Sequence, residues 1–150
     1  FTLDELIKSQ VAERKGINNN PSPEQIENLK ALAVNILQPI RSHYNEPLQI
    51  SSGFRCAELC VAIGSKITSQ HVADENAAAA DFEIWGKDNK EVATYIRDNL
   101  EFDQLILEFY KEGEPNSGWI HCSYSSNENR NQCLYASRED GKTKYTPWLV

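Results

Sequence analysis

The feature that most constrains the fold is segment 22–44, where apolar residues recur at helical spacing. The stripe consists of Ile26, Leu29, Ala33, Ile36, Leu37 and Ile40. Ser22, Pro23 and Gln25 supply an N-cap, a first-turn proline and the partner of a capping box. Pro39 lies inside the pattern and predicts a kink, because proline lacks the N–H that the helix would use. The segment therefore predicts one long amphipathic helix with a single buried face.

Shorter patterns divide the remaining chain into a helical first part and a strand-rich second part. We expect further helices over residues 2–15, 56–64 and 88–100. We expect strands over residues 47–55, 79–85, 102–110, 118–125 and 132–137, with the last paired to 118–125. This order favours an α+β fold in which N-terminal helices pack on a mostly antiparallel sheet. A length of 150 residues fits one domain spanning 1–150.

The charge and hydropathy of the chain argue against several classes of function. The formal net charge of −7 disfavours general nucleic-acid binding and binding to anionic membrane surfaces. No apolar run reaches the roughly 18 residues that a membrane span needs. The N-terminus is amphipathic and charged, so we expect no signal peptide. The four cysteines, none of them in a CxxC pair, are then expected to be reduced thiols.

Cys122 and Cys133 are the one cysteine pair that a local hairpin would bring together. They flank the turn-rich segment 125–131. In a symmetric hairpin their side chains would face each other on one side of the sheet, within reach of a cross-strand disulfide. The sequence is compatible with two free thiols at Cys122 and Cys133 and also with one disulfide between them.

Three predicted strands or strand edges each carry one polar group where apolar residues are expected: Asp81, Glu108 and His121. His71 lies in the loop before the first of these strands. Two histidines and one carboxylate are a known ligand set for catalytic zinc, which leaves a fourth position for water. Glu108 is the best candidate for the base that accepts a proton from that water. Arg55 is placed to bind a substrate carboxylate or a developing oxyanion.

The spacing of these residues is also compatible with purely structural roles that involve no metal. The chain has no HExxH motif, so His71 and His121 are also compatible with two separate structural histidines. Glu108 would then lie on a solvated face. Of the neighbouring residues, Trp119 and Tyr124 are predicted to pack in the core rather than to form aromatic walls.

Four motifs, in order, carry a resemblance to a known family. They are "ISSGFRCAEL", "TSQHVADENAAAADFEI", "FDQLILEF" and "GWIHCSYSSNENRN". Together they resemble the zinc D-Ala-D-Ala carboxypeptidase and L-alanyl-D-glutamate peptidase family, which includes phage endolysins and vancomycin-resistance dipeptidases. That family shares its fold with the hedgehog signalling domain. The resemblance runs from the first helix to about residue 137.

The resemblance implies a role for each candidate residue. The family's S-x-H, A-x-D and W-x-H elements match His71, Asp81 and His121, which implies that these three bind Zn²⁺. Arg55 in "SGFR" matches the family's arginine on the substrate side. Glu108 matches the glutamate of the "FDQLI-x-E" strand in phage members. Ser69 and Gln104 are expected to orient the ligands.

The sequence departs from the family pattern in the spacing between the S-x-H element and the A-x-D element. The interval from His71 to Asp81 is about three residues longer than the pattern and lacks its glycine. The extra residues bring Asp74 and Glu75 close to the ligands in sequence. We favour Asp81 as the ligand and an outward loop, because a strand fixes a ligand better than a loop does.

The second departure concerns the base. Many members place a glutamate three residues before the last histidine, where this chain has Gly118. Glu108 is therefore the predicted base, and Glu112 and Glu114 in the following loop are its competitors.

The resulting expectation is a phage-encoded zinc peptidase that cleaves stem peptides of bacterial peptidoglycan. It would act in the host cytoplasm before release or from the phage virion, with virion proteins as further partners. One alternative is a non-catalytic virion module that keeps the fold, which the acidic spacer and the negative charge favour. Another is a zinc hydrolase that acts on a different amide or ester.

Overall fold

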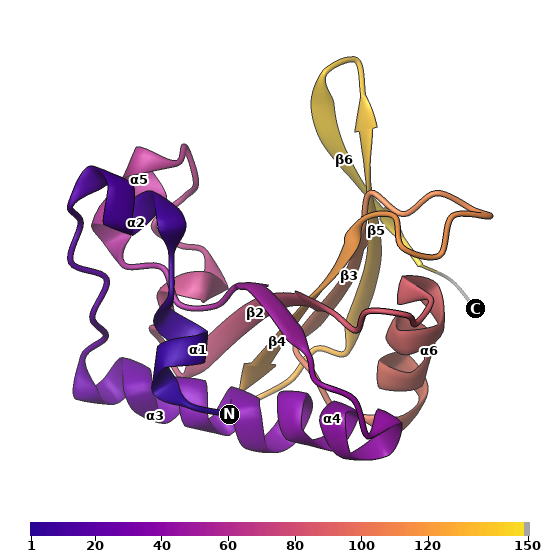
Figure 1. Cartoon of the computed structure of the whole chain (residues 1–150), viewed down its shortest axis with the longest axis horizontal. Helices are drawn as coiled ribbons and strands as arrows, with labels where there is room; N and C mark the ends of the chain where they lie inside the picture. The colour runs from indigo at the N-terminus through magenta and orange to yellow at the C-terminus, as the bar shows by residue number, and fades with distance from the viewer. Residues whose placement is uncertain (149–150) are drawn as a thin grey trace.

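A six-stranded sheet with the order β1-β2-β4-β3-β5-β6 forms the centre of the computed structural model, which describes residues 1–148 (Figure 1). Its strands are β1 (Gln49–Ser52), β2 (Ala77–Glu83), β3 (Gln104–Glu108), β4 (Trp119–Ser125), β5 (Gln132–Glu139) and β6 (Lys142–Pro147). Neighbouring strands are antiparallel except for β3 and β5, which are parallel. The predicted α+β class with a mostly antiparallel sheet is therefore confirmed.

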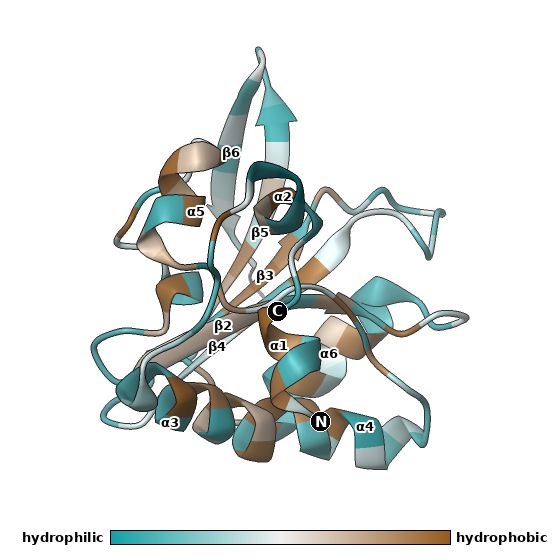
Figure 2. Ribbon diagram, turned by 60° about the vertical axis from the view of Figure 1, so that its left-hand side comes forward, coloured by the Kyte–Doolittle hydropathy of each residue, from teal (hydrophilic) through white to brown (hydrophobic). Residues whose placement is uncertain are grey.

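One face of the sheet is covered by the long helical segment and by α6 (Asn89–Asn99) (Figure 1). The helical segment consists of α3 (Pro23–Leu32), a π-helical turn η1 (Ala33–Leu37) and α4 (Gln38–Tyr44). Of its predicted stripe, Leu29, Ile36, Leu37 and Ile40 are buried and Ile26 and Ala33 are half-buried. Figure 2 shows hydrophobic and hydrophilic residues in turn along α3. No helix among residues 1–148 combines the length and apolar character that a membrane crossing requires.

A π-helical turn just before Pro39 accommodates this proline within the helical segment. The N–H of Gln38 bonds to the carbonyl of Ala33, one residue further back than in an α-helix. A π-turn directly before a proline re-registers the backbone where the proline cannot donate. The kink expected at Pro39 stays a prediction, and the helix continues through Pro39 to Tyr44.

The N-terminal segment forms two helices, so the single helix predicted over 2–15 is wrong. These are α1 (Leu3–Ile7) and α2 (Gln10–Lys15). Lys8 and Ser9 between them are extended, and the Ser9 hydroxyl accepts a hydrogen bond from the Ala12 N–H at 3.2 Å. Ser9 therefore starts a second helix as its N-cap, which helical periodicity does not reveal.

The predicted pairing of 132–137 with 118–125 is also wrong, because β3 lies between β4 and β5. Leu105 is opposite Cys122 on one side and opposite Cys133 on the other. Two strand spacings of about 4.8 Å separate the two cysteines, which is beyond the reach of a disulfide. Both are free thiols. Asn131 fixes the start of β5 beside β3, through two hydrogen bonds with the Phe102 backbone.

The opposite face of the sheet is left open by the helices. Ala78, Ala80 and Phe82 of β2 point into the core, and Asp81 points to the open face. The strand begins two residues earlier than predicted, and its four alanines are all buried. Two short helices border the open face, α5 (Ala57–Ala62) and η2 (Gln70–Val72).

Candidate metal centre

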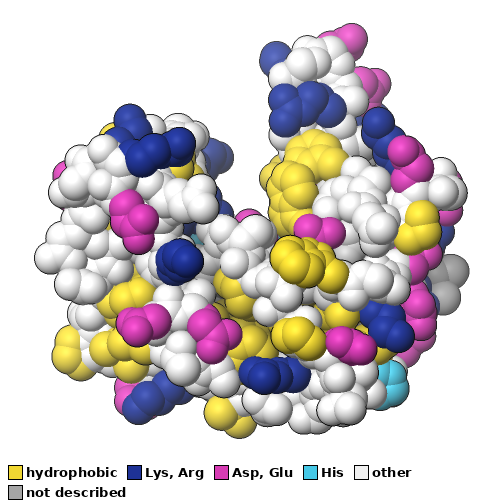
Figure 3. Space-filling view, viewed as in Figure 1, with side chains coloured by type: hydrophobic (Ala, Val, Ile, Leu, Met, Phe, Trp, Pro, Cys, Tyr) yellow, Lys and Arg dark blue, Asp and Glu magenta, His cyan; other side chains and the backbone are white. Residues whose placement is uncertain are grey.

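The open face of the sheet forms the floor of a cleft of about 890 Å³. Figure 3 shows the surface hollowed between the lobe that carries α2 and α5 and the β5–β6 hairpin. The residues that line the cleft include the five that the sequence favoured for the site: Arg55, His71, Asp81, Glu108 and His121.

His71 is buried in η2 and is held by hydrogen bonds at its ring and its backbone. Its Nδ1–H donates to the Gly53 carbonyl at 2.7 Å. The Arg55 N–H donates to the His71 carbonyl at 2.8 Å, and the Ser69 hydroxyl accepts from the His71 N–H at 3.2 Å. A carbonyl can only accept, so Nδ1 carries the proton and Nε2 presents a lone pair to the cleft.

Gly53 is required by the close approach of α1. A Cβ at this position would lie 2.2 Å from the Leu6 carbonyl oxygen. Asn19 strengthens the same loop, because its side chain bonds to the Phe54 carbonyl at 3.0 Å and to the Cys56 N–H at 2.8 Å. The "SGFR" turn is therefore a rigid support for His71. Asn19 lies in a segment that the sequence marks only as loop.

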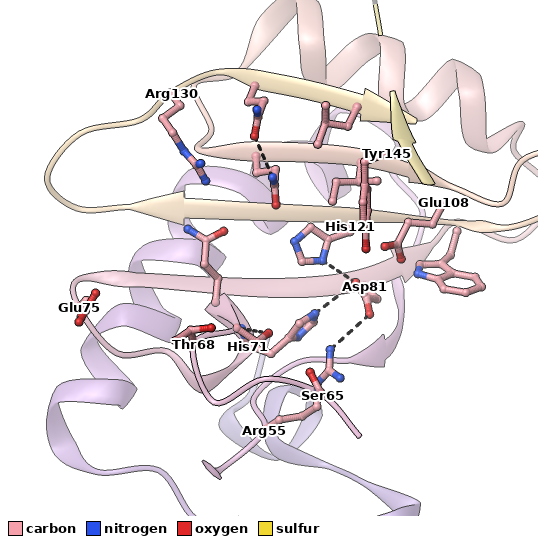
Figure 4. A pocket seen from close by; sticks show the side chains of 17 residues that line it. Arg55, Ser65, Thr68, His71, Glu75, Asp81, Glu108, His121, Arg130 and Tyr145 are labelled. Carbon is pink, nitrogen blue, oxygen red and sulfur yellow. Dashed lines mark hydrogen bonds and ion pairs between the residues drawn. The ribbon is translucent and has the colours of Figure 1, made fainter. Parts of the chain in front are cut away.

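Asp81 and His121 are direct partners in the register of β2 and β4. The Asp81 Oδ1 lies 2.9 Å from His121 Nδ1 and 3.4 Å from His71 Nε2 (Figure 4). Ligand atoms of all three residues lie within 4.8 Å of one another. The structure thus brings together the three residues that the sequence proposed as metal ligands.

The charges of this cluster are those of a cation site. Burial lowers the pKa of His71, which favours its neutral form. Burial also acts to raise the pKa of Asp81, but the hydrogen bond from His121 outweighs it and holds that pKa well below its usual range. The His71 Nε2 lone pair therefore faces an ionised carboxylate, two acceptors with no proton between them. Two imidazoles and one carboxylate fit a zinc ion in number and kind.

The lengthened spacer turns away from the cluster, as the sequence favoured. Ala73, Glu75 and Asn76 have positive φ angles, which reverse the chain within a few residues. The Asp74 carboxylate accepts a hydrogen bond from Gln25 on α3 at 3.0 Å. Glu75 is exposed at the edge of the cleft, well apart from Asp81 in Figure 4.

Glu108 lies beside the cluster without belonging to it. Ile106, two residues earlier, is opposite His121 in the register, so the Glu108 side chain shares the cleft face with the histidine. Leu105 and Leu107 are fully buried on the other face, as the alternation predicted. Burial, and then the Asp81 charge, raise the pKa of Glu108.

The competing glutamates lie elsewhere. Glu112 and Glu114 are exposed and do not line the cleft, and Glu112 forms an ion pair with Lys90. Gly118 has φ +64°, and a Cβ there would lie 1.9 Å from the Glu108 carbonyl oxygen. This contact excludes a glutamate at 118, which is a physical reason for the departure from the E-x-x-H pattern.

Arg55 and Trp119 complete the wall near the cluster. The Arg55 Nη2 lies 4.0 Å from Asp81 Oδ2, and its buried Nε has no partner among residues 1–148. Trp119 is half-buried and lines the cleft, whereas Tyr124 packs against the core on the other face. The prediction of core packing is thus wrong for Trp119. Trp119 and Tyr124 lie an odd number of positions apart in β4, so their side chains point to opposite faces of the sheet.

The sequence missed the part of the cleft that comes from β5, β6 and the loop before them. These residues are Arg130, Gln132, Leu134 and Tyr145. Asp140 and Gly141 both have positive φ angles and form the turn of the β5–β6 hairpin. An Asp-Gly pair is a strong hairpin signal, so β6 was predictable from this turn. Gln104, expected to orient a ligand, instead donates to Gln132 at 2.8 Å.

A family model described as Peptidase M15 matches residues 1–123. The chain belongs to the peptidase M15 family. The matched region includes all five candidate residues and ends before β5, so the resemblance to zinc D-Ala-D-Ala carboxypeptidases is confirmed at the level of the family. Membership in this family indicates that the chain has the fold of a metallopeptidase and belongs to that class of enzyme. No curated protein matches the chain.

Proposed function

We propose that this M15 member is a zinc peptidase that hydrolyses peptide bonds in the stem peptides of bacterial peptidoglycan. The observation that carries the proposal is the convergence of His71, Asp81 and His121 from three separate segments at the floor of an open cleft. Glu108 lies next to them, on the same face and outside the ligand set. Three protein ligands and a neighbouring carboxylate that does not bind the metal are typical of a metal-dependent hydrolase.

Zinc bound to this cluster supplies a Lewis acid and lowers the pKa of its water to near 7. Glu108 accepts the proton of the attacking water and returns it to the leaving amine. Its raised pKa suits this task, because a base works best when its pKa lies near the working pH. The Arg55 guanidinium, on the far side of Asp81 from His121 in Figure 4, donates to the substrate carbonyl or a substrate carboxylate.

The choice of substrate rests on the resemblance to wall-lytic peptidases of phages. It supports a phage-encoded protein that acts in the host cytoplasm before release or from a virion. The rival hypothesis, a non-catalytic virion module, drew on the acidic spacer and on the negative net charge. That spacer lies outside the ligand cluster, so of these two observations only the negative net charge still favours the rival.

Digestion of purified peptidoglycan tests the proposal. The zinc-loaded protein is incubated with wall sacculi, and the released peptides are identified by mass spectrometry. We expect new amine and carboxyl termini within the stem peptides, and none with protein that has been treated with a chelator. A zinc-loaded protein that releases no peptide would support the non-catalytic rival.

A further inference from the structure

The cleft face of the sheet is arranged in rows of paired residues. The middle row contains Asp81, His121, Ile106 and Leu134, from β2, β4, β3 and β5. One neighbouring row contains Trp119, Glu108, Ala136 and Tyr145. The row on the other side contains Gln104 and Gln132. Successive rows lie about 7 Å apart, close to the span of two residues in an extended peptide.

Arg130 lies at the glutamine end of the cleft, just before β5. Figure 4 shows it on the far side of His121 from Glu108 and Tyr145. Its Nε donates to Asp103 Oδ1 at 3.0 Å and its Nη2 to Asp103 Oδ2 at 2.8 Å. Its backbone N–H donates to Asp103 Oδ1 at 3.1 Å. Gln70, next to His71, donates to the same carboxylate at 2.6 Å.

These bonds fix the guanidinium and leave one edge of it free. The Asp103 side chain is 7% exposed, whereas that of Arg130 is 56% exposed. Nη1 has no hydrogen-bond partner in the part of the chain that the structure describes. A guanidinium already ordered by a buried partner loses little rotamer freedom when it binds a ligand. Its free N–H groups are therefore preorganised donors at the cleft.

We infer that Arg130, together with the Gln104 and Gln132 amides, forms a subsite for a carboxylate of the substrate. The inference rests on the proposed peptidase function and names its substrate class: an acidic peptide. The row spacing places the Gln104 and Gln132 amides about two residues of extended peptide from the row of the metal ligands, and Arg130 lies beyond them at the same end of the cleft. Glu75 at the cleft edge and Glu128 in the adjoining groove are both exposed, so salt screens their effect on such a ligand.

Matched peptides test the subsite. A synthetic stem peptide is compared with a set in which each carboxylate is amidated in turn, and kcat/KM is measured for zinc-loaded protein. We expect one amidation to lower kcat/KM by about 10- to 100-fold, the worth of a hydrogen bond to a charged group. In Arg130→Gln this sensitivity should vanish. Binding of the same peptides to the Glu108→Gln protein, measured by calorimetry, should show the same preference.

Arg138→Gln is the matched control. It removes the same charge from β5, the strand that follows Arg130, at an exposed position that does not line the cleft. It should retain the preference, and zinc content and thermal stability are measured for every variant. The inference is overturned if no amidation affects the wild type, or if Arg130→Gln lowers activity on all peptides equally. If the zinc-loaded wild type cleaves and binds none of them, the proposed function itself fails.

Discussion

Asp81 Oδ1 and His121 Nδ1 lie 2.9 Å apart because the two residues face each other across β2 and β4. A slip of one residue in this register would turn either side chain into the core. Two of the three candidate ligands are thus fixed by the hydrogen-bonded sheet itself. The third, His71, is fixed by its bond to Gly53.

The ligand assignment predicts which carboxylate holds zinc. Asp81→Ala and His121→Ala should each weaken zinc binding by more than about 100-fold, since losing an outer partner of a ligand alone costs about 10- to 100-fold. Asp74→Ala and Glu75→Ala should bind zinc like the wild type, because both side chains lie outside the cluster. Zinc affinity is measured by competition with a chelating dye. The reverse order among the carboxylates would assign the ligand to the spacer.

The base assignment predicts a separation of zinc binding from turnover. Glu108→Gln keeps the shape of the side chain and removes the proton acceptor. We expect zinc content and fold to be retained and hydrolysis of wall peptides to fall by about 10²- to 10⁴-fold. Glu112→Gln and Glu114→Gln are controls, because both residues are exposed outside the cleft. Normal turnover by Glu108→Gln alongside a defect in either control would place the base in the loop.

The contact at Gly118 predicts an unequal pair of glycine variants. Gly16 and Gly118 both have positive φ angles, but only at 118 would a Cβ meet backbone within 4 Å. Gly16→Ala should therefore cost only about 1–2 kcal/mol of unfolding free energy. Gly118→Ala should cost clearly more, measured by denaturant unfolding. Gly118→Glu should not restore activity to Glu108→Gln, and a rescue would contradict the steric account.

The burial of His71 predicts that the metal-free protein loses stability as the pH falls. Its folded pKa is lowered by burial, so below an unfolded pKa of about 6.5 the unfolded chain binds a proton that the folded chain does not. The stabilisation is complete above that pH and is lost progressively below it, by at most about 1.4 kcal/mol per pH unit. Asp81, whose folded pKa is also lowered, adds to the loss only below about pH 4.

Denaturant unfolding of chelated protein between pH 7 and 5 measures this slope. His71→Gln should flatten it. His43→Gln is the control, because His43 is exposed on α4 and lies outside the cluster. An unchanged slope in His71→Gln would show that other groups cause the loss.

The candidate site was readable from the sequence because strand parity is local. Alternation put Asp81, Glu108 and His121 on the opposite side of each strand from its apolar neighbours, and the family motifs tied the three residues together. The choice of strand neighbours depends on contacts between distant segments. The position of β5 beside β3 rests on the bonds of Asn131 to Phe102, and on those of Arg130 to Asp103, so periodicity could not give it. The missed half of the cleft follows from that error.

Zinc titration of the chelated protein shows whether hydrolysis depends on the cluster of His71, Asp81 and His121. Hydrolysis of a purified stem peptide is followed while zinc is added to protein of known concentration. We predict that activity rises from zero, in proportion to bound zinc, and saturates at about one zinc per chain, since three protein ligands make one site. Zinc bound at that ratio without hydrolysis, or hydrolysis that persists in the chelated protein, would contradict the assignment of this cluster as the centre of a zinc peptidase.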